Sequence, residues 1–512
     1  MGFKTLALKL PTDFTAEQLR RKIERNLRIK DFSFQIENKS LDARKKSNIF
    51  WQIRVVVNSS EIKGGEVPVI EKLEIPFKKR KEQVVVVGSG PAGFFAALIL
   101  QKAGFNVTLI ERGSDVGKRT KSISAFENTG EFDTQNNYAF GEGGAGTFSD
   151  GKLTSRSKRI SKEKNFIVDN YIEAGAPAEI AYMTHPHLGT DNLRKIVKNL
   201  RKAFEDLGGK ILFETLLEDV VIKNSKVTDV VTSQGILPAN ALFIAPGHSA
   251  FETYRMLMQR GVQFRTKNFA IGSRMEHRQE VINLAQWGKE KLPGVKAAEY
   301  RITSPADGKH QVFSFCMCPG GMVVPAAAYP ETNIVNGMSY YRRGGKFANA
   351  ACVAAIHPDE LAGKNVSPGK ALGVVEELER KFYEITSNYN APICSIEDFL
   401  QQTNKKNQFE SSYPLGVNSM PLWELLPNPV VQSMQEGLKD FIRKMRGFET
   451  GNLIGLESKT SSPVQVIREK DGRCTGFENL YLAGEGSGYA GGIISSGADG
   501  IKVAMNFIHN QI

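Results

Sequence analysis

Three glycines and one glutamate are spaced so that they could bind a diphosphate-linked nucleotide. Gly88, Gly90 and Gly93 follow a run of four valines at 84–87, and Glu111 comes about 20 residues later. The first glycine allows a tight turn, the second lets a pyrophosphate approach the backbone, and the third lets a helix pack closely on a strand. The Glu111 carboxylate can accept both hydroxyls of an adenosine ribose.

The elements around these residues supply the geometry that this chemistry needs. The valine run predicts a strand buried on both faces, residues 91–103 an apolar helix, and residues 106–110 a second strand that ends at Glu111. The helix start supplies free amide donors and a positive dipole. A βαβ turn without a ligand is the alternative, and the complete order of elements favours a dinucleotide site.

A second glycine-rich stretch follows at residues 138–153. Five glycines between positions 141 and 151 exclude a helix or a regular strand. They predict a loop whose backbone lies against something flat or anionic, for which a flavin ring is the first candidate. A mobile surface loop fits less well because Phe140 and Phe148 can anchor the segment.

Two more strands run into glycines. One strand near residue 244 ends at Gly247, and another at 480–482 ends at Gly484 and Glu485, ahead of a helix from about Ser495. Ligands of α/β folds bind at the carboxyl ends of strands. Glu485 can bind a ribityl or phosphate-linked hydroxyl, and the helix start can stabilise a reduced flavin.

The region between these halves contains a Cys-Met-Cys sequence. In an extended strand, Cys316 and Cys318 would share a face with their Cα atoms about 6.5 to 7 Å apart, the outer limit for a disulfide. They could relay electrons to a flavin, attack a substrate as thiolate, or simply be small buried residues. The last alternative carries the most weight, and electron relay comes second.

Other polar groups in this region predict an anionic or carbonyl-bearing substrate, with surface salt bridges as the alternative. They are Arg274, Glu276, His277, Arg342, Arg343 and Lys459. No metal site is predicted, because His185 and His187 lack further ligands at suitable spacing and the other cysteines form no second close pair. We interpret these two histidines as ordinary loop residues rather than catalytic ones.

The motifs GSGPAGFFAAL, GEGGAGTFSDGKL, HPHLGTD, FSFCMCPGG, NGMS, SKTSSPV and AGEGSGYAGGIISSGADGI run from residue 84 to the end. Together they resemble the glutathione-reductase-like FAD superfamily, in the group without a second nucleotide domain. More closely, the chain is similar to a bacterial family of FAD-dependent dehydrogenases that carry an extra N-terminal α+β domain. The family's usual Asp is Glu485 here, and Lys459 stands where Arg is expected.

The resemblance implies FAD as cofactor, and the glycine motifs and the family pattern give one set of candidate contacts. The candidate cofactor residues are Gly88, Gly90, Pro91, Ala92, Gly93, Glu111, Arg112, Arg119, Gly143, Gly144, Gly146, Thr147, Leu217, Gly247, Gly484, Glu485, Gly492, Ile493 and Ile494. The candidate catalytic residues are Cys316, Cys318, Arg274, His277 and Lys459.

The predicted fold class is α/β with three parts. They are a small α+β domain at 1–78, a discontinuous Rossmann domain that binds FAD at 83–261 and 448–512, and an inserted α+β substrate domain at 262–447. The first 82 residues hold 12 Lys and 7 Arg against 11 acids, so they carry +8 of the net charge of +12. A basic module on a near-neutral body is unlike a nucleic-acid binder.

We therefore expect a cytoplasmic FAD-dependent oxidoreductase that passes hydride between flavin N5 and a small-molecule substrate. NADH or NADPH would bind only transiently, because there is no second GxGxxG. Neither a signal peptide nor an 18-residue apolar stretch is found, so no membrane is expected. The alternatives are an RNA-modifying flavoprotein and a flavin-bound sensor or assembly protein with little turnover. The oligomeric state is left open.

Overall fold

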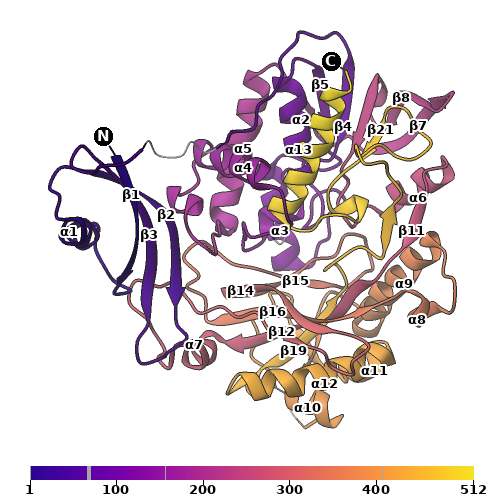
Figure 1. Cartoon of the computed structure of the whole chain (residues 1–512). Coiled ribbons are helices and arrows are strands. Elements are labelled where there is room, and N and C mark those ends of the chain that lie inside the picture. Colours follow the sequence, from indigo (N-terminus) through magenta and orange to yellow (C-terminus); the bar gives the residue numbers. More distant parts are fainter. Residues whose placement is uncertain (1, 66–70, 156, 406–407, 512) are drawn as a thin grey trace.

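The structure is a computed structural model that describes residues 2–65, 71–155, 157–405 and 408–511. Residues 1 and 512, where the predicted outer domains begin and end, lie outside this described part. Figure 1 shows three parts, with the N-terminal domain in indigo beside a Rossmann-like domain and an inserted domain in orange. Residues 83–266 and 464–509, which are far apart in the sequence, meet in the Rossmann-like domain.

The N-terminal domain is a three-stranded antiparallel sheet covered by one helix. Its elements are β1 (Gly2–Leu10), α1 (Ala16–Leu27), β2 (Ser33–Asp42) and β3 (Phe50–Ser59), and the sheet order is β1-β3-β2. Ile53, Val55 and Val57 alternate along β3 and are fully buried with Leu19 and Ile23 of α1. The α+β arrangement follows the predicted order of strand, helix, strand and strand.

This domain is joined to the body by backbone hydrogen bonds. Lys39 N donates to Tyr182 O at 2.8 Å, and Thr184 N donates to Lys39 O at 3.0 Å. The following charged segment, which the sequence presents as a linker, also docks: Arg80 is buried, its backbone N donates to Gly104 O at 2.9 Å and its guanidinium lies 4.5 Å from the Phe105 ring. The N-terminal domain is therefore a fixed part of the molecule.

The Rossmann-like domain has a five-stranded parallel sheet in the order β21-β10-β4-β5-β6 and a three-stranded sheet β7-β8-β9. Its elements are β4 (Gln83–Val87), α2 (Pro91–Lys102), β5 (Asn106–Ile110), α3 (Val116–Thr129), η1 (Ala145–Phe148), α4 (Ser161–Glu173), η2 (Ala178–Ala181), α5 (Gly189–Asp206), β6 (Lys210–Leu212), β7 (Leu217–Lys223), β8 (Lys226–Thr232), β9 (Gly235–Pro238), β10 (Ala241–Ile244), α6 (Phe251–Gln259), β11 (Phe264–Thr266), β20 (Val464–Val466), β21 (Leu480–Leu482), η4 (Glu485–Ser487) and α13 (Ile493–His509).

Helix α2 forms the centre of this domain because it is apolar on all sides. Residues 92–100 are all buried, and the yellow helix α13 lies beside it in Figure 1. A Cβ at Gly500 of α13 would meet the Ala92 carbonyl oxygen at 2.1 Å. The two helices can therefore approach closely only because position 500 lacks a side chain.

The inserted domain is built on an eight-stranded sheet with the order β13-β14-β16-β12-β19-β17-β18, and β15 pairs with β14. Its elements are β12 (Phe269–Arg278), α7 (Gln279–Trp287), β13 (Thr303–Ser304), β14 (Val312–Pro325), β15 (Val335–Met338), β16 (Phe347–Ile356), α8 (Asp359–Ala362), α9 (Pro368–Thr386), β17 (Ala391–Ser395), α10 (Ile396–Gln401), β18 (Val417–Ser419), α11 (Leu422–Leu425), α12 (Asn428–Lys444), η3 (Phe448–Thr450) and β19 (Asn452–Glu457).

The predicted end of this domain at residue 447 is wrong. Strand β19 lies beyond that boundary, yet it pairs with β12 and β17 at the centre of the sheet. The boundary was placed too early because a single buried strand after a helix carries no sequence signal for the sheet it joins. Within the described residues, no helix is both long and apolar enough to cross a bilayer.

Candidate active site

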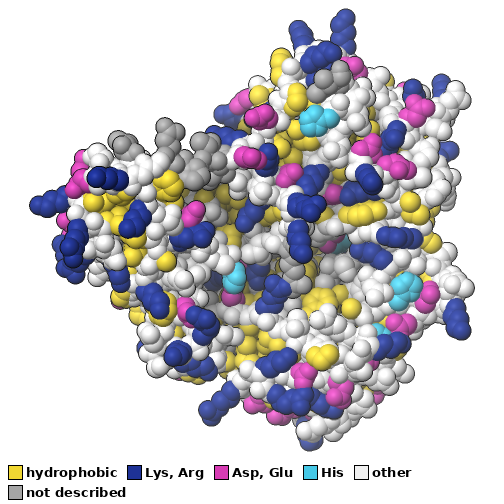
Figure 2. Space-filling model, in the orientation of Figure 1, with side chains coloured by type: hydrophobic (Ala, Val, Ile, Leu, Met, Phe, Trp, Pro, Cys, Tyr) yellow, Lys and Arg dark blue, Asp and Glu magenta, His cyan; other side chains and the backbone are white. Residues whose placement is uncertain are grey.

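All three parts of the molecule line one cavity of about 1220 Å³. Small-molecule sites usually measure about 300 to 1,000 Å³, so this volume leaves room for a cofactor and a second ligand together. Figure 2 shows Lys and Arg side chains spread over the whole face of the molecule, interspersed with acids, instead of gathered on the N-terminal domain. The cavity, and not a basic surface patch, is the outstanding feature.

The glycine turn between β4 and α2 forms one wall. A Cβ at Gly88 would meet the Ala245 carbonyl oxygen at 2.3 Å, and one at Gly93 would meet the Gly88 carbonyl oxygen at 1.9 Å, so both glycines serve backbone packing. A Cβ at Gly90 would meet only Gly144 Cα, at 3.7 Å, and would otherwise point into the cavity. Position 90 is where a ligand can approach the helix start.

Glu111 lines the same wall and accepts four hydrogen bonds. Its Oε2 accepts from the backbone N and Oγ of Ser89, at 3.0 and 2.7 Å, and its Oε1 accepts from the backbone N of Gly113 and Gly141, at 3.0 and 3.1 Å. The carboxylate therefore joins the glycine turn to the glycine loop. Its contact with a ribose stays a prediction.

Arg119 lies beneath the glycine loop and does not reach the cavity. The fully buried guanidinium donates to the carbonyl oxygens of Asn137, Tyr138, Gly141, Glu142 and Gly144 at 2.8 to 3.2 Å. Burial lowers the pKa of Arg119 to about 10, which still leaves it charged at neutral pH. One buried cation, Arg119, therefore holds the backbone of the glycine loop in place from the side away from the cavity.

The third wall comes from the C-terminal segment and the loop after β10. Glu485 is half-buried and lines the cavity, and among the described residues no group donates a hydrogen bond to its carboxyl group. Burial raises the pKa of Glu485 to about 8, with Lys267 acting in the opposite direction. Gly247 and Gly492 line the cavity beside it, and a Cβ at either would meet nothing within 4 Å.

These features fit a bound dinucleotide cofactor. The open glycines leave room against the backbone, and Glu485 presents to the cavity a half-buried carboxyl group to which no described protein group donates. The predicted cofactor residues that line the cavity are Gly88, Gly90, Pro91, Ala92, Glu111, Arg112, Gly144, Gly146, Leu217, Gly247, Glu485, Gly492 and Ile493. Those that lie behind the lining are Gly93, Arg119, Gly143, Thr147, Gly484 and Ile494.

The two cysteines of β14 do not form the extended pair that the sequence predicts. Both thiols are free, and Cys316 has a left-handed φ of 46°, where the ladder to β16 shifts register. Cys316 lines the cavity, whereas Cys318 is buried behind it. Burial raises the pKa of both thiols, that of Cys318 to about 12, so neither is disposed to be a thiolate at neutral pH.

Arg274 and His277 on β12 also lie behind the cavity lining. Arg274 is fully buried, pairs with Glu457 at 2.9 Å and donates to the Cys316 carbonyl oxygen at 2.6 Å. The His277 Nε2 is 2.8 Å from the Phe448 carbonyl oxygen, and burial lowers the pKa of this histidine to about 4. Arg274 therefore joins β14 to β19, and His277 contacts the backbone of η3 just before β19.

Lys459 does line the cavity. Its Nζ lies 2.8 Å from a carboxylate oxygen of Glu379 and 3.9 Å from the centre of the Phe251 ring. Beside it, burial and then the charge of Lys459 lower the pKa of His248 to about 3. Of the five predicted catalytic residues, Lys459 and Cys316 are therefore the two that can contact a ligand.

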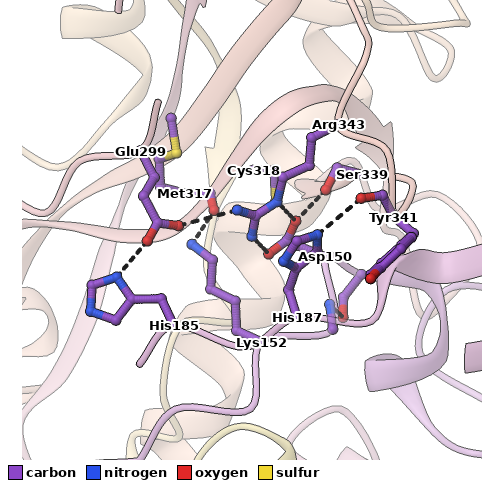
Figure 3. Close-up of polar contacts among 12 residues, drawn as sticks. Asp150, Lys152, His185, His187, Glu299, Met317, Cys318, Ser339, Tyr341 and Arg343 are labelled. Atoms are coloured by element: carbon purple, nitrogen blue, oxygen red, sulfur yellow. Dashed lines mark hydrogen bonds and ion pairs between the residues drawn. The ribbon is translucent and has the colours of Figure 1, made fainter. Parts of the chain in front are cut away.

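The structure assembles a polar cluster that the sequence did not predict (Figure 3). Asp150 accepts from Arg343 Nη2 at 2.6 Å and from Ser339 Oγ, and Arg343 also contacts Glu299 at 3.4 Å. Glu299 in turn lies 2.6 Å from His185 Nδ1. Asp150 belongs to the GTFSDGKL motif, so the sequence contained a signal that could have identified it as a site residue. Glu299 lies in a segment without any motif, so the sequence contained no such signal for it.

Two further cavity residues lie within the cluster. Lys152 donates to the Met317 carbonyl oxygen, and His187 Nε2 lies 3.0 Å from the Tyr341 carbonyl oxygen. Burial and then Arg343 lower the pKa of His187 to about 4, whereas the hydrogen bond to Glu299 raises that of His185. The pKa values of the two loop histidines are therefore shifted in opposite directions. Within the described part of the chain, no group of three or more His, Cys, Asp or Glu residues could hold a metal ion.

Comparison with known proteins identifies the family. A family model described as "FAD-dependent protein, C-terminal domain-like" matches residues 268–460, and a "NAD(P)-binding Rossmann-like domain" model matches residues 86–146. An uncharacterized protein of Clostridium beijerinckii is 38% identical over 99% of both chains. Thiamine thiazole synthase of Aeropyrum pernix is 28% identical over 43% of this chain and 73% of its own.

Among solved structures, glycine oxidase of Bacillus cereus aligns with 84% of this chain and 96% of its own, with 14% identity and a TM-score of 0.32. The two family models agree with the glycine-lined cavity, and the relative is similar to this chain over its whole length. The chain therefore belongs to the family of FAD-dependent oxidoreductases, with FAD as its cofactor.

Proposed function

We propose that this oxidoreductase transfers a hydride between FAD and an anionic or carbonyl-bearing small molecule that shares the cavity with the cofactor. The observation that carries the proposal is the continuity of the cavity, which runs from the glycine turn at Gly90 to the polar cluster around Lys152. One ligand can thus reach both the cofactor walls and a set of charged side chains without leaving an enclosed space.

Both backbone groups and side chains of the cavity walls would contact FAD. The helix start at Gly90 offers backbone amides to the diphosphate, and Leu217 supplies an apolar contact for the adenine. Glu485 on the cavity wall would accept from a ribityl hydroxyl, and Ile493 with the start of α13 would contact the isoalloxazine. Bound there, the flavin supplies hydride chemistry at N5.

The substrate side contributes orientation and charge. Cys316, Lys459 and residues of the polar cluster line the same cavity as these cofactor walls. Because the raised pKa values keep the thiols of Cys316 and Cys318 protonated, we assign them packing and hydrogen-bonding roles rather than nucleophilic attack. NADH or NADPH would enter the same cavity as a transient donor.

Cofactor content gives the first test. Purified protein should be yellow and should release FAD, not FMN, on heating. Gly90→Val places a branched side chain in the open space over the helix start and should reduce the bound FAD at least tenfold. The control is Gly369→Val outside the cavity lining, since a Cβ there would meet nothing within 4 Å. Equal FAD content in the two variants would contradict the proposed site.

Anaerobic stopped-flow mixing with NADH and with NADPH identifies the donor. Bleaching of the flavin absorbance by one of them shows pyridine-nucleotide reduction. If neither bleaches the flavin, pyridine nucleotides are excluded as donors and the substrate itself must reduce the flavin.

A further inference from the structure

Lys152 differs from three ion-paired cations of the cavity in what surrounds its charge. Arg343 pairs with Asp150, Lys296 lies 3.5 Å from Glu179, and Lys459 lies 2.8 Å from Glu379. Among the described residues, the only group that accepts from Lys152 is a neutral backbone carbonyl, that of Met317, and no carboxylate lies within ion-pair distance. An ammonium group has three donors, so Lys152 retains two for a ligand.

His185 supplies a second donor close to Lys152 (Figure 3). Its Nδ1 is engaged by Glu299 at 2.6 Å, which leaves Nε2 without a partner among the described residues. The same hydrogen bond raises the pKa of His185, whereas burial and the nearby charges of Lys152 and Arg343 act against that shift. When protonated, the ring can donate from Nε2 into the cavity.

Part of the cavity wall comes from the N-terminal domain and carries apolar side chains beside Lys39, whose Nζ lies 4.5 Å from the centre of the Trp51 ring. Leu41, Ala43 and Trp51 line the cavity, together with Val295 and Trp287 of the inserted domain. Leu41 and Ala43 pack against the inserted-domain core, and Val295 packs against the core of the N-terminal domain. The docked domain is therefore a wall of the cavity and not a separate module.

We propose that the substrate is a carboxylate with an apolar body, that Lys152 and His185 bind its carboxylate, and that the N-terminal domain contacts its body. Charge-assisted hydrogen bonds fix the anion, and the burial of apolar surface against Leu41 and Trp51 adds affinity. The substrate class rests on the proposed function, since it concerns the ligand that shares the cavity with FAD.

Matched probes test this on the holoenzyme by isothermal titration calorimetry. The probes are 4-phenylbutyrate, its uncharged isostere 4-phenylbutanamide, and acetate, which has the charge without the apolar body. We expect 4-phenylbutyrate to bind at least about tenfold more tightly than either of the others. Equal affinity for the amide, or no binding of 4-phenylbutyrate, would overturn the proposal.

Two lysine variants locate the anion. Lys152→Met should reduce the affinity for 4-phenylbutyrate to that for the amide, whereas Lys164→Met, which changes an exposed lysine at the same cavity, should leave it unchanged. Equal losses in the two variants would refute the role of Lys152. The flavin spectrum and the melting temperature serve as controls for folding.

A third variant probes the apolar wall without touching the charges. Leu41→Ala should weaken 4-phenylbutyrate several-fold and leave acetate binding unchanged, and an unchanged affinity for 4-phenylbutyrate would overturn the role of the N-terminal domain. All these titrations measure binding alone. Absence of hydride transfer would therefore contradict the proposed function without altering their outcome.

Discussion

Arg119 shows how one residue can govern a ligand site that it does not touch. Five backbone carbonyl oxygens of the glycine loop converge on its guanidinium, and a Cβ at Gly141 would meet its Cδ at 2.4 Å. A glycine loop has little intrinsic order because glycine loses more conformational freedom on folding than any other residue. The buried cation offsets that cost.

Replacement of Arg119 by Met should therefore disorganise the loop. We expect the free energy of unfolding to fall by about 3 to 5 kcal/mol, because several buried carbonyl groups lose their donor at once. Chemical denaturation of the holoenzyme measures the change, and the bound FAD should fall with it. Arg21→Met on the exposed face of α1 is the control and should change stability by less than about 0.5 kcal/mol. Wild-type stability and FAD content in Arg119→Met would contradict this role.

At the level of single residues, the sequence predicted what depends on local backbone geometry. The turn at Gly88 to Gly93 and the acid at Glu111 follow from adjacent elements, so their places on the cavity wall were predictable. The contact of Glu299 with His185 was not, because it joins residues 114 positions apart through the tertiary fold. Arg274 was predicted to be catalytic from its type, but its full burial depends on three strands that only the fold brings together.

Strand β14 is the element in which prediction and structure differ most. A regular strand would place Cys316 and Cys318 on one face, but the left-handed φ of Cys316 and the register shifts opposite β16 separate them. Cys316 therefore lines the cavity, whereas Cys318 is buried in the core. Such bulges are frequent next to active sites, where they redirect a side chain.

The reactivity of the two thiols follows from this geometry. Alkylation by iodoacetamide requires the thiolate, and burial raises the pKa of Cys318 to about 12. In the native holoenzyme, Cys318 should therefore stay unmodified at pH 7.5. Its alkylation rate should rise about tenfold for each increase of one pH unit while the protein remains folded. Peptide mass spectrometry measures both cysteines.

Guanidinium-unfolded protein, in which all five cysteines should react, is the control for reagent access. Native labelling of Cys318 as fast as in the unfolded chain would show that it is accessible as a thiolate. That result would restore the nucleophile interpretation that the structure disfavours.

On the scale of the molecule, the cofactor walls come from distant parts of the chain. Gly90 and Glu111 line the cavity together with Glu485 and Ile493, and β10 pairs with β4 on one side and β21 on the other. A ligand that contacts all these segments binds the folded state alone. It therefore stabilises the whole Rossmann-like domain by mass action.

Addition of FAD to the apoprotein should raise the melting temperature accordingly. At a free concentration 100 times the dissociation constant, the gain is about 2.7 kcal/mol. FMN lacks the ADP half that the turn at Gly90 would hold, so it should raise the melting temperature far less. Differential scanning calorimetry compares the two, and equal shifts would argue against a dinucleotide site at Gly90.

The place of α13 has a consequence for the order of synthesis. Chains emerge from the ribosome N-terminus first, and their domains generally fold as units in that order. Here the strand β21 and the helix α13, which lies against α2, follow α2 by more than 370 residues. The nascent chain must therefore leave the α13-facing side of the apolar α2 uncovered until α13 has been made, and the cofactor walls are incomplete until then.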